Sequence, residues 1–220
     1  MSRLLPLFPL QLVVFPGSAV PLHIFEERYK EMVTAAEAAG TEFGIVLARD
    51  NGIMNAGCTV LVESVLKRYP DGRFDVLTRG QRRFVIKSLN QDKDYLRGEV
   101  EFYSDEDPES APPELRRAAI LASEKMRDAL SESEAKPAAS EVGDSREAAP
   151  DPEHPFLSFQ LAENVDDLDF RNLIQRSRSE AERLRSFANF TDEYVAKKQY
   201  AAKMKRLAPT NGYGHPPTIH

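Results

Sequence analysis

A series of short strand-like segments in the first half of the chain constrains the fold most strongly. The segments are rich in Val, Leu, Ile, Phe and Tyr, and they read FGIVLA, TVLVESVLKRY, RFDVLTRG, RRFVIKSL and YLRGEVEFY. The linkers DNG, PDG and NQDKD have turn chemistry, because Asn and Gly tolerate positive φ and Asp accepts hydrogen bonds within its own turn. Short strands at close spacing predict a small, mostly antiparallel barrel or sandwich instead of a parallel βαβ fold.

One helix is predicted inside this β-rich region. Between Phe25 and Ala39, apolar residues recur at three- and four-residue spacing with charges between them, and Gly40 supplies a C-terminal stop. The preceding residues 4–15 form β-rich pieces interrupted by proline, and the pair Pro16 and Gly17 is a turn signal.

The second half of the chain is predicted to be helical. An apolar stripe follows Pro113, and helical patterns resume at PFLSFQLAENV and at DDLDFRNLIQ, where Asp166 is the expected cap. Ser179 and Glu182 have the spacing of a capping box, which would begin a helix that ends near Leu207.

These patterns predict an α+β protein with a β-barrel-like lobe at residues 1–108 and a helical lobe at residues 109–208. Residues 131–153 contain Val142 as their only large aliphatic side chain, so they predict a mobile acidic loop. Residues 209–220 are expected to be a disordered tail.

Composition limits the function classes. The net charge is −6, and residues 1–107 carry 13 basic and 16 acidic residues, which disfavours bulk affinity for nucleic acid. Cys58 is the single cysteine, so no internal disulfide can form, and a reducing cytoplasm is the expected compartment. Prolines interrupt the apolar N-terminus, and no apolar run approaches the roughly 18 residues that span a bilayer, so neither export nor a membrane anchor is expected.

No motif predicts catalysis, a cofactor or a metal. The segment GIMNAGCT at residues 52–59 has the glycine spacing of a phosphate-binding loop, but Cys58 replaces the lysine and a strand-like segment follows, so a hairpin loop is favoured. The four histidines are scattered, without metal-ligand spacing. Because catalytic groups assemble in space, an unrecognised hydrolase stays open as a third possibility.

Two separated segments resemble one family. The opening LPLFPLQLVVFPGSAVPLHIFEERYKEMV is similar to the start of the substrate-binding domain of Lon proteases, and PDGRFDVLTRGQRRFVIKSL is similar to a later hairpin of that domain. The resemblance implies a barrel lobe related to PUA folds, a helical lobe, and a role in gripping unfolded or tagged proteins for an AAA+ engine. About 220 residues leave no room for that ATPase and protease, so a non-catalytic, free-standing domain is expected.

Two sets of residues are candidate binding sites. The resemblance implies polypeptide partners, together with a separate protease, and the first apolar stretch offers candidates for a polypeptide groove: Phe8, Leu10, Val13 and Phe15. The alternative is an RNA-binding module on the PUA-like lobe, for which the candidates are Arg79, Arg82, Arg83 and Lys87. A solvated face is the favoured interpretation of these cations, and the client and the oligomeric state stay open.

Overall fold

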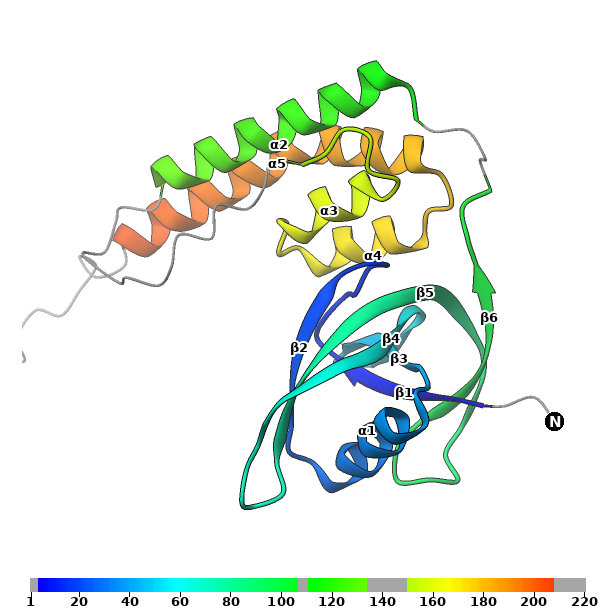
Figure 1. The fold of residues 1–220 in the computed structure, drawn as a ribbon. Helices are drawn as coiled ribbons and strands as arrows, with labels where there is room; N and C mark the ends of the chain where they lie inside the picture. Colours follow the sequence, from blue (N-terminus) through cyan, green and yellow to red (C-terminus); the bar gives the residue numbers. More distant parts are fainter. Residues whose placement is uncertain (1–3, 107–110, 134–149, 208–220) are drawn as a thin grey trace, which may run out of the picture.

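The structure is a computed structural model that describes residues 4–106, 111–133 and 150–207. Figure 1 shows two lobes, with the strands and one helix below and the remaining helices above. The predicted α+β class, with an early helix inside the β region and a helical lobe after it, is confirmed. The predicted boundary at residue 108 lies outside the described residues.

Five strands of the lower lobe, β1 and β3 to β6, close into a barrel, and β2 extends the sheet beside β5. The sheet order is β2-β5-β4-β3-β1-β6, and an additional β5–β6 pairing closes the ring. All neighbours are antiparallel except β1 and β3, which are parallel. The strands are β1 (Leu5–Leu10), β2 (Ala19–Ile24), β3 (Phe43–Arg49), β4 (Gly52–Arg68), β5 (Phe74–Asn90) and β6 (Arg97–Tyr103).

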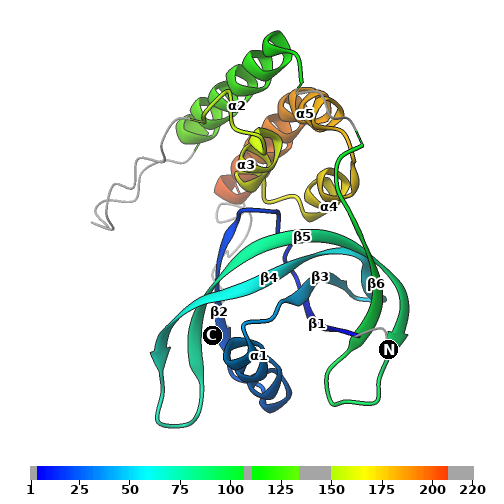
Figure 2. The same cartoon turned by 45° about the vertical axis from the view of Figure 1, so that its right-hand side comes forward.

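Helix α1 (Glu27–Ala39) packs on the barrel at the end opposite the helical lobe (Figure 2). Its buried face, which includes Met32 and Val33, joins the apolar cluster of β1, β3, β4 and β5. Gly40 ends the helix in the left-handed conformation, with φ of 59°, so the predicted stop is confirmed.

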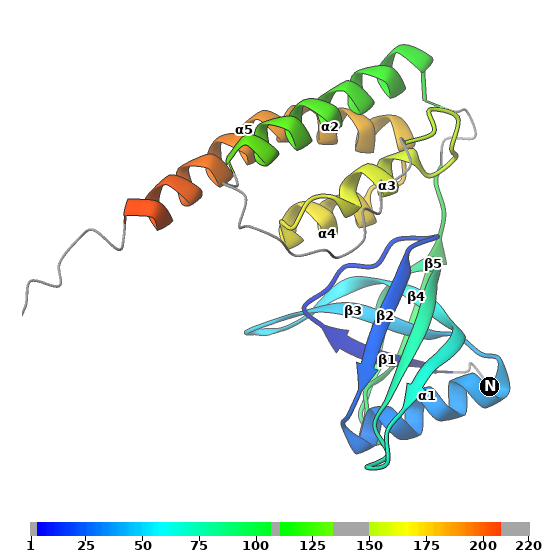
Figure 3. The same cartoon turned by 60° about the vertical axis from the view of Figure 1, so that its left-hand side comes forward.

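Four helices form the upper lobe: α2 (Pro113–Ser133), α3 (Leu157–Glu163), α4 (Leu168–Arg176) and α5 (Glu180–Leu207). The long helices α2 and α5 lie side by side, while α3 and α4 lie between them and the barrel (Figures 1 and 3). No helix in the described part of the chain is both long and apolar enough to span a membrane.

Several local predictions are wrong. Residues 52–59 are the start of β4 and not a hairpin loop, because they pair with β3 and five of the last six are buried or half-buried. The two segments around Gly80 form the single strand β5. Residues 131–133 continue α2, while most of the predicted acidic loop, and the predicted tail, lie outside the described residues.

The helix caps also differ from the predictions. Asp167, not Asp166, caps α4, and its carboxylate accepts from the amides of Asp169 and Phe170 at 3.1 and 3.0 Å. Half of the capping box is present, since the Ser179 hydroxyl accepts from the Glu182 amide at 3.3 Å. The Glu182 carboxylate accepts instead from a neighbouring serine hydroxyl.

Candidate polypeptide-binding groove

The β lobe carries a groove of about 650 Å³ at the end of the barrel that holds α1. The end of β1, the connection from β2 to α1, and the connection from β5 to β6 form its walls. We call it the α1 groove. Among the residues that line it are two of the predicted polypeptide-binding residues, Phe8 and Leu10.

Aromatic and aliphatic side chains make the floor of the α1 groove. Phe8 is 6% exposed and stacks on Tyr29 with ring centroids 4.0 Å apart, while Leu10 is half-buried. Phe25 stands above this floor with 58% of its surface exposed. An exposed phenyl ring beside a concave apolar floor is the composition expected of a site for apolar side chains.

The rim of the α1 groove is charged but nearly balanced. Arg28 pairs with Glu26 at 2.6 Å and lies over the Tyr29 ring, while Lys93 and Asp94 stand on the opposite wall. Such a rim presents no strong field of either sign, so it selects apolar contact over charge.

His23 belongs to the same rim and is held by Asp75. The His23 Nδ1 atom lies 2.5 Å from the Asp75 carboxylate, which also accepts from the Tyr69 hydroxyl at 2.8 Å. These hydrogen bonds, that of His23 first, lower the pKa of Asp75. His23 also stacks on Phe25 with centroids 6.0 Å apart, so it supports the exposed ring.

The strand edge beside the α1 groove is poorly suited to pairing with a peptide strand. β2 is the edge of the sheet and pairs only with β5 (Figure 3). Pro21 lies in the middle of β2 and has no N–H to donate. Prolines at sheet edges discourage strand addition. Side-chain contacts, not an added strand, are therefore the mode of binding that this groove favours.

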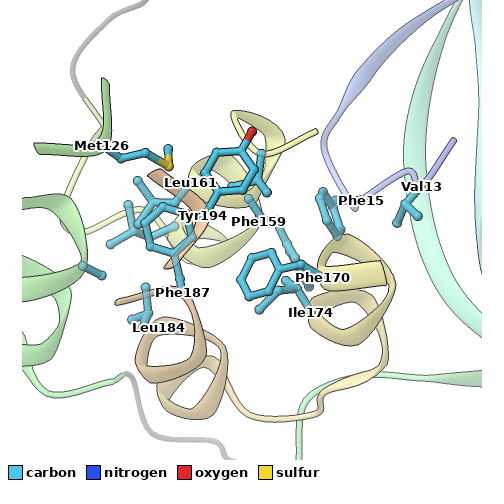
Figure 4. Packing of buried hydrophobic residues seen from close by; sticks show 14 of the residues in the cluster. Val13, Phe15, Met126, Phe159, Leu161, Phe170, Ile174, Leu184, Phe187 and Tyr194 are labelled. Carbon is cyan, nitrogen blue, oxygen red and sulfur yellow. The ribbon is translucent and has the colours of Figure 1, made fainter. Parts of the chain in front are cut away.

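Val13 and Phe15 lie elsewhere, in the joint between the lobes. They are 2% and 0% exposed, and they pack with Phe159, Phe170 and Ile174 of the helical lobe (Figure 4). The prediction that all four apolar residues form one surface groove is therefore corrected, because the chain leaves the sheet after Leu10 and enters the core.

Hydrogen bonds hold this inter-lobe loop on both sides. Arg171 and Gln175 of α4 donate to the carbonyls of Val13 and Val14 at 2.8 and 2.7 Å. On the barrel side, Gly80 leaves no space for a side chain, because a Cβ atom there would lie 2.0 Å from the Phe15 carbonyl oxygen. The loop is therefore packed between the two lobes and is not an open surface.

A buried ionic network closes the other side of the joint. Arg83 of β5 is 4% exposed and donates to Asp105 at 2.5 Å and to the carbonyls of Gln175 and Ser177. Arg183 of α5 is fully buried and forms two hydrogen bonds to Asp105, at 2.6 and 2.7 Å. Burial disfavours ionisation of Asp105, but these arginines outweigh it and hold the pKa of Asp105 below its usual value.

The other predicted RNA-binding cations are paired with acids on the barrel surface. Arg79 pairs with Glu63, and Lys87 pairs with Glu101. Arg82 pairs with Glu42 at 2.9 Å and stacks on Phe102. The four candidates therefore do not form one basic face, because three are neutralised at the surface and Arg83 is inside the joint.

Cys58 is not suited to nucleophilic chemistry. Its side chain is 0% exposed, and burial raises the pKa of the thiol to about 12. Within the described ranges, no three His, Cys, Asp or Glu side chains gather closely enough to hold a metal ion.

Comparison with known proteins decides the family. Residues 4–184 match the family model of the ATP-dependent protease La (LON) substrate-binding domain. The chain belongs to this family. Relatives of this LON domain include Lon proteases of Flavobacterium johnsoniae and Porphyromonas gingivalis, which are 29% and 25% identical over 131 and 114 residues. Those alignments cover 55% and 48% of the chain but only 16% and 13% of the two proteases, so the catalytic domains lie outside the matched region.

Two solved structures share the fold of this LON domain. The crystal structure of a Lon N-terminal domain protein from Xanthomonas campestris has a TM-score of 0.62 at 24% identity and covers 83% of this chain and 95% of its own. The N-terminal domain of the Mycobacterium avium complex Lon protease has a TM-score of 0.57 at 15% identity, with coverage of 86% and 98%. The resemblance inferred from the two sequence segments is thereby confirmed.

Sequence reasoning missed three parts of the site. Phe25 was assigned to the apolar face of the helix, but it precedes α1, whose first residue is Glu27. The Glu-Glu pair that follows Phe25 was the available signal, since acidic residues favour the first turn of a helix. The alternation of β5 could have shown that Arg82 and Arg83 point to opposite faces. Nothing in the sequence indicated that Asp105 and Arg183 would meet.

Proposed function

We propose that this LON domain recognises polypeptides, without catalysis, by binding their apolar side chains in the α1 groove. The observation that carries the proposal is Phe25, a large aromatic side chain that is 58% exposed above an apolar floor. Leaving such a ring in water costs free energy that a bound apolar side chain would recover. Unfolded chains expose side chains of this kind, whereas folded clients bury them.

The proposed role extends to delivery or retention of clients for a separate protease, in proteolysis or protein quality control. The Lon proteases that match this chain carry a domain of this family, which supports such a role. The cytoplasm is the proposed compartment, because clients and their proteases meet there.

A titration with a fluorescently labelled, permanently unfolded polypeptide tests the proposal. The Phe25→Ser variant should bind about ten-fold more weakly, since loss of a buried phenyl contact costs on the order of 1.4 kcal/mol. Leu66→Ser is the matched control, because Leu66 is 57% exposed on β4 and does not line the α1 groove. Equal losses in both variants would contradict a specific groove.

The RNA alternative gains no support from the arrangement of charges, because each of its four cations has an acidic partner. A salt series with labelled single-stranded RNA separates the two functions. Binding through phosphates weakens steeply with salt, whereas apolar binding changes little. RNA affinity that falls with salt and with Arg82→Gln would favour the alternative.

A further inference from the structure

A second cleft, of about 670 Å³, opens between the lobes, at the opposite end of the barrel from the α1 groove. Met54 of β4 forms the barrel side of this inter-lobe cleft, and the end of α4 and the first turns of α5 form the other side. The proposed polypeptide-binding groove uses none of these residues.

Asn172 lies beside the cleft but offers it no donor. Its side chain is 4% exposed and lines the cleft, while its Nδ2 atom is enclosed and makes no hydrogen bond to any described residue. A ligand in the cleft does not reach this amide, so the charged donors that it meets are arginines.

Two arginines of the cleft have no carboxylate partner among the described residues. Every arginine that the structure describes in the barrel lobe pairs with a carboxylate. Arg176 and Arg185, in contrast, form no ion pair with any residue in the described ranges. Of the two acids on the same rim, Asp169 is paired with Arg49, and Glu182 accepts from the Ser177 hydroxyl.

Apolar surface lies beside these donors. Leu173 is 53% exposed and Met54 is half-buried, and both line the cleft. Guanidinium forks bind carboxylates through two parallel hydrogen bonds. The ligand that matches this set has a carboxylate next to an apolar group.

We propose that the inter-lobe cleft binds the free C-terminal carboxylate of a polypeptide whose last residue is apolar. Arg176 and Arg185 take the carboxylate, and the terminal side chain packs on Leu173 and Met54. The inference rests on the proposed function, since it adds a terminus-specific contact to the recognition of unfolded segments by the α1 groove.

Two labelled unfolded peptides of identical sequence ending in leucine test the inference, one with a free carboxylate and one with a C-terminal amide. The free carboxylate should bind about ten-fold more tightly, as expected for one charge-assisted interaction of about 1.4 kcal/mol. The Arg176→Gln, Arg185→Gln double variant should reduce this difference to less than about two-fold and leave the amidated peptide unchanged. Arg117→Gln is the control, because Arg117 is an exposed arginine of α2 that forms no ion pair with the described residues.

The outcomes separate the two proposals. If the amidated peptide binds and depends on Phe25, but the carboxylate adds nothing, the cleft inference is overturned and the groove stands. If the carboxylate preference is present but survives the double variant, the cleft is not its site. If neither peptide binds, both proposals fail.

Discussion

The α1 groove and the joint between the lobes use opposite ends of one apolar stretch in different ways. Phe8 and Leu10 stay in β1 and floor the groove, where Phe25 remains exposed. Five residues later, Val13 and Phe15 are buried against the helical lobe. Similar residues therefore line the proposed binding groove at one end and build the joint at the other, and hydropathy alone cannot separate these roles.

The largest expected effect comes from Asp105→Ala in the joint. This change leaves Arg83 buried without a carboxylate partner and Arg183 with Glu180 alone, so the free energy of unfolding should fall by about 3 kcal/mol. Chemical denaturation followed by circular dichroism measures it. The surface pair of Arg178 and Glu106 supplies the control, because Glu106→Ala should cost less than about 1 kcal/mol. A similar loss in both variants would contradict the structural role of the network.

The acid dependence of stability sharpens the same point. The pKa of Asp105 is lower in the folded state, so its contribution is fully present above its unfolded pKa of about 3.9 and disappears as the pH falls through the folded value. The free energy of unfolding, measured by denaturation between neutral and acidic pH, should therefore depend less on pH in Asp105→Asn than in wild type. Asp92→Asn should reduce this pH dependence much less, because the ion pair of Asp92 with Arg97, which lowers the pKa of Asp92, is exposed and screened by solvent.

Substitutions of Phe15 in the joint and of Phe25 beside the α1 groove separate effects on stability from effects on polypeptide binding. Phe15→Ala should lower the free energy of unfolding by roughly 3 kcal/mol, because it leaves a cavity in the joint. Phe25→Ala should change it by less than about 1 kcal/mol and instead weaken polypeptide binding. Thermal unfolding and anisotropy titrations on both variants measure the two effects. The comparison breaks if Phe25→Ala destabilises as much as Phe15→Ala.

The smallest expected effect is that of Arg82→Gln. Arg82 is exposed and paired with Glu42, and surface pairs contribute about 0–1 kcal/mol. Stability should stay within that range, and polypeptide affinity should stay within about two-fold of wild type. Denaturation and the same titration check both values.

Local patterns were enough to predict the fold. Turn residues and β-branched runs marked the strands, three- and four-residue spacing marked the helices, and Gly40 marked the end of α1. The failures occurred where tertiary contacts overrode local signals. The glycines of residues 52–59 imitated a loop, yet Gly57 lies in a strand where the Phe84 ring fills the space beside it.

The joint between the lobes was less predictable than the fold, because its residues are distant in the sequence. Arg83 and Asp105 are separated by 22 positions, and Asp105 and Arg183 by 78. Burial of Arg83 depends on these partners, so the alternation along β5 places it opposite Arg82 but does not show that its face is buried. A local cue distinguishes Phe8 from Phe15, because β1 ends between them at Leu10.

Amide chemical-shift mapping with an unfolded polypeptide tests the central claim most directly, because it locates the contact on the native chain. The account predicts that the largest shifts fall in three segments around the α1 groove: residues 8–10, 23–29 and 91–96. Shifts confined to β5 and β6 around Arg82 and Lys87, with the groove unchanged, would contradict it.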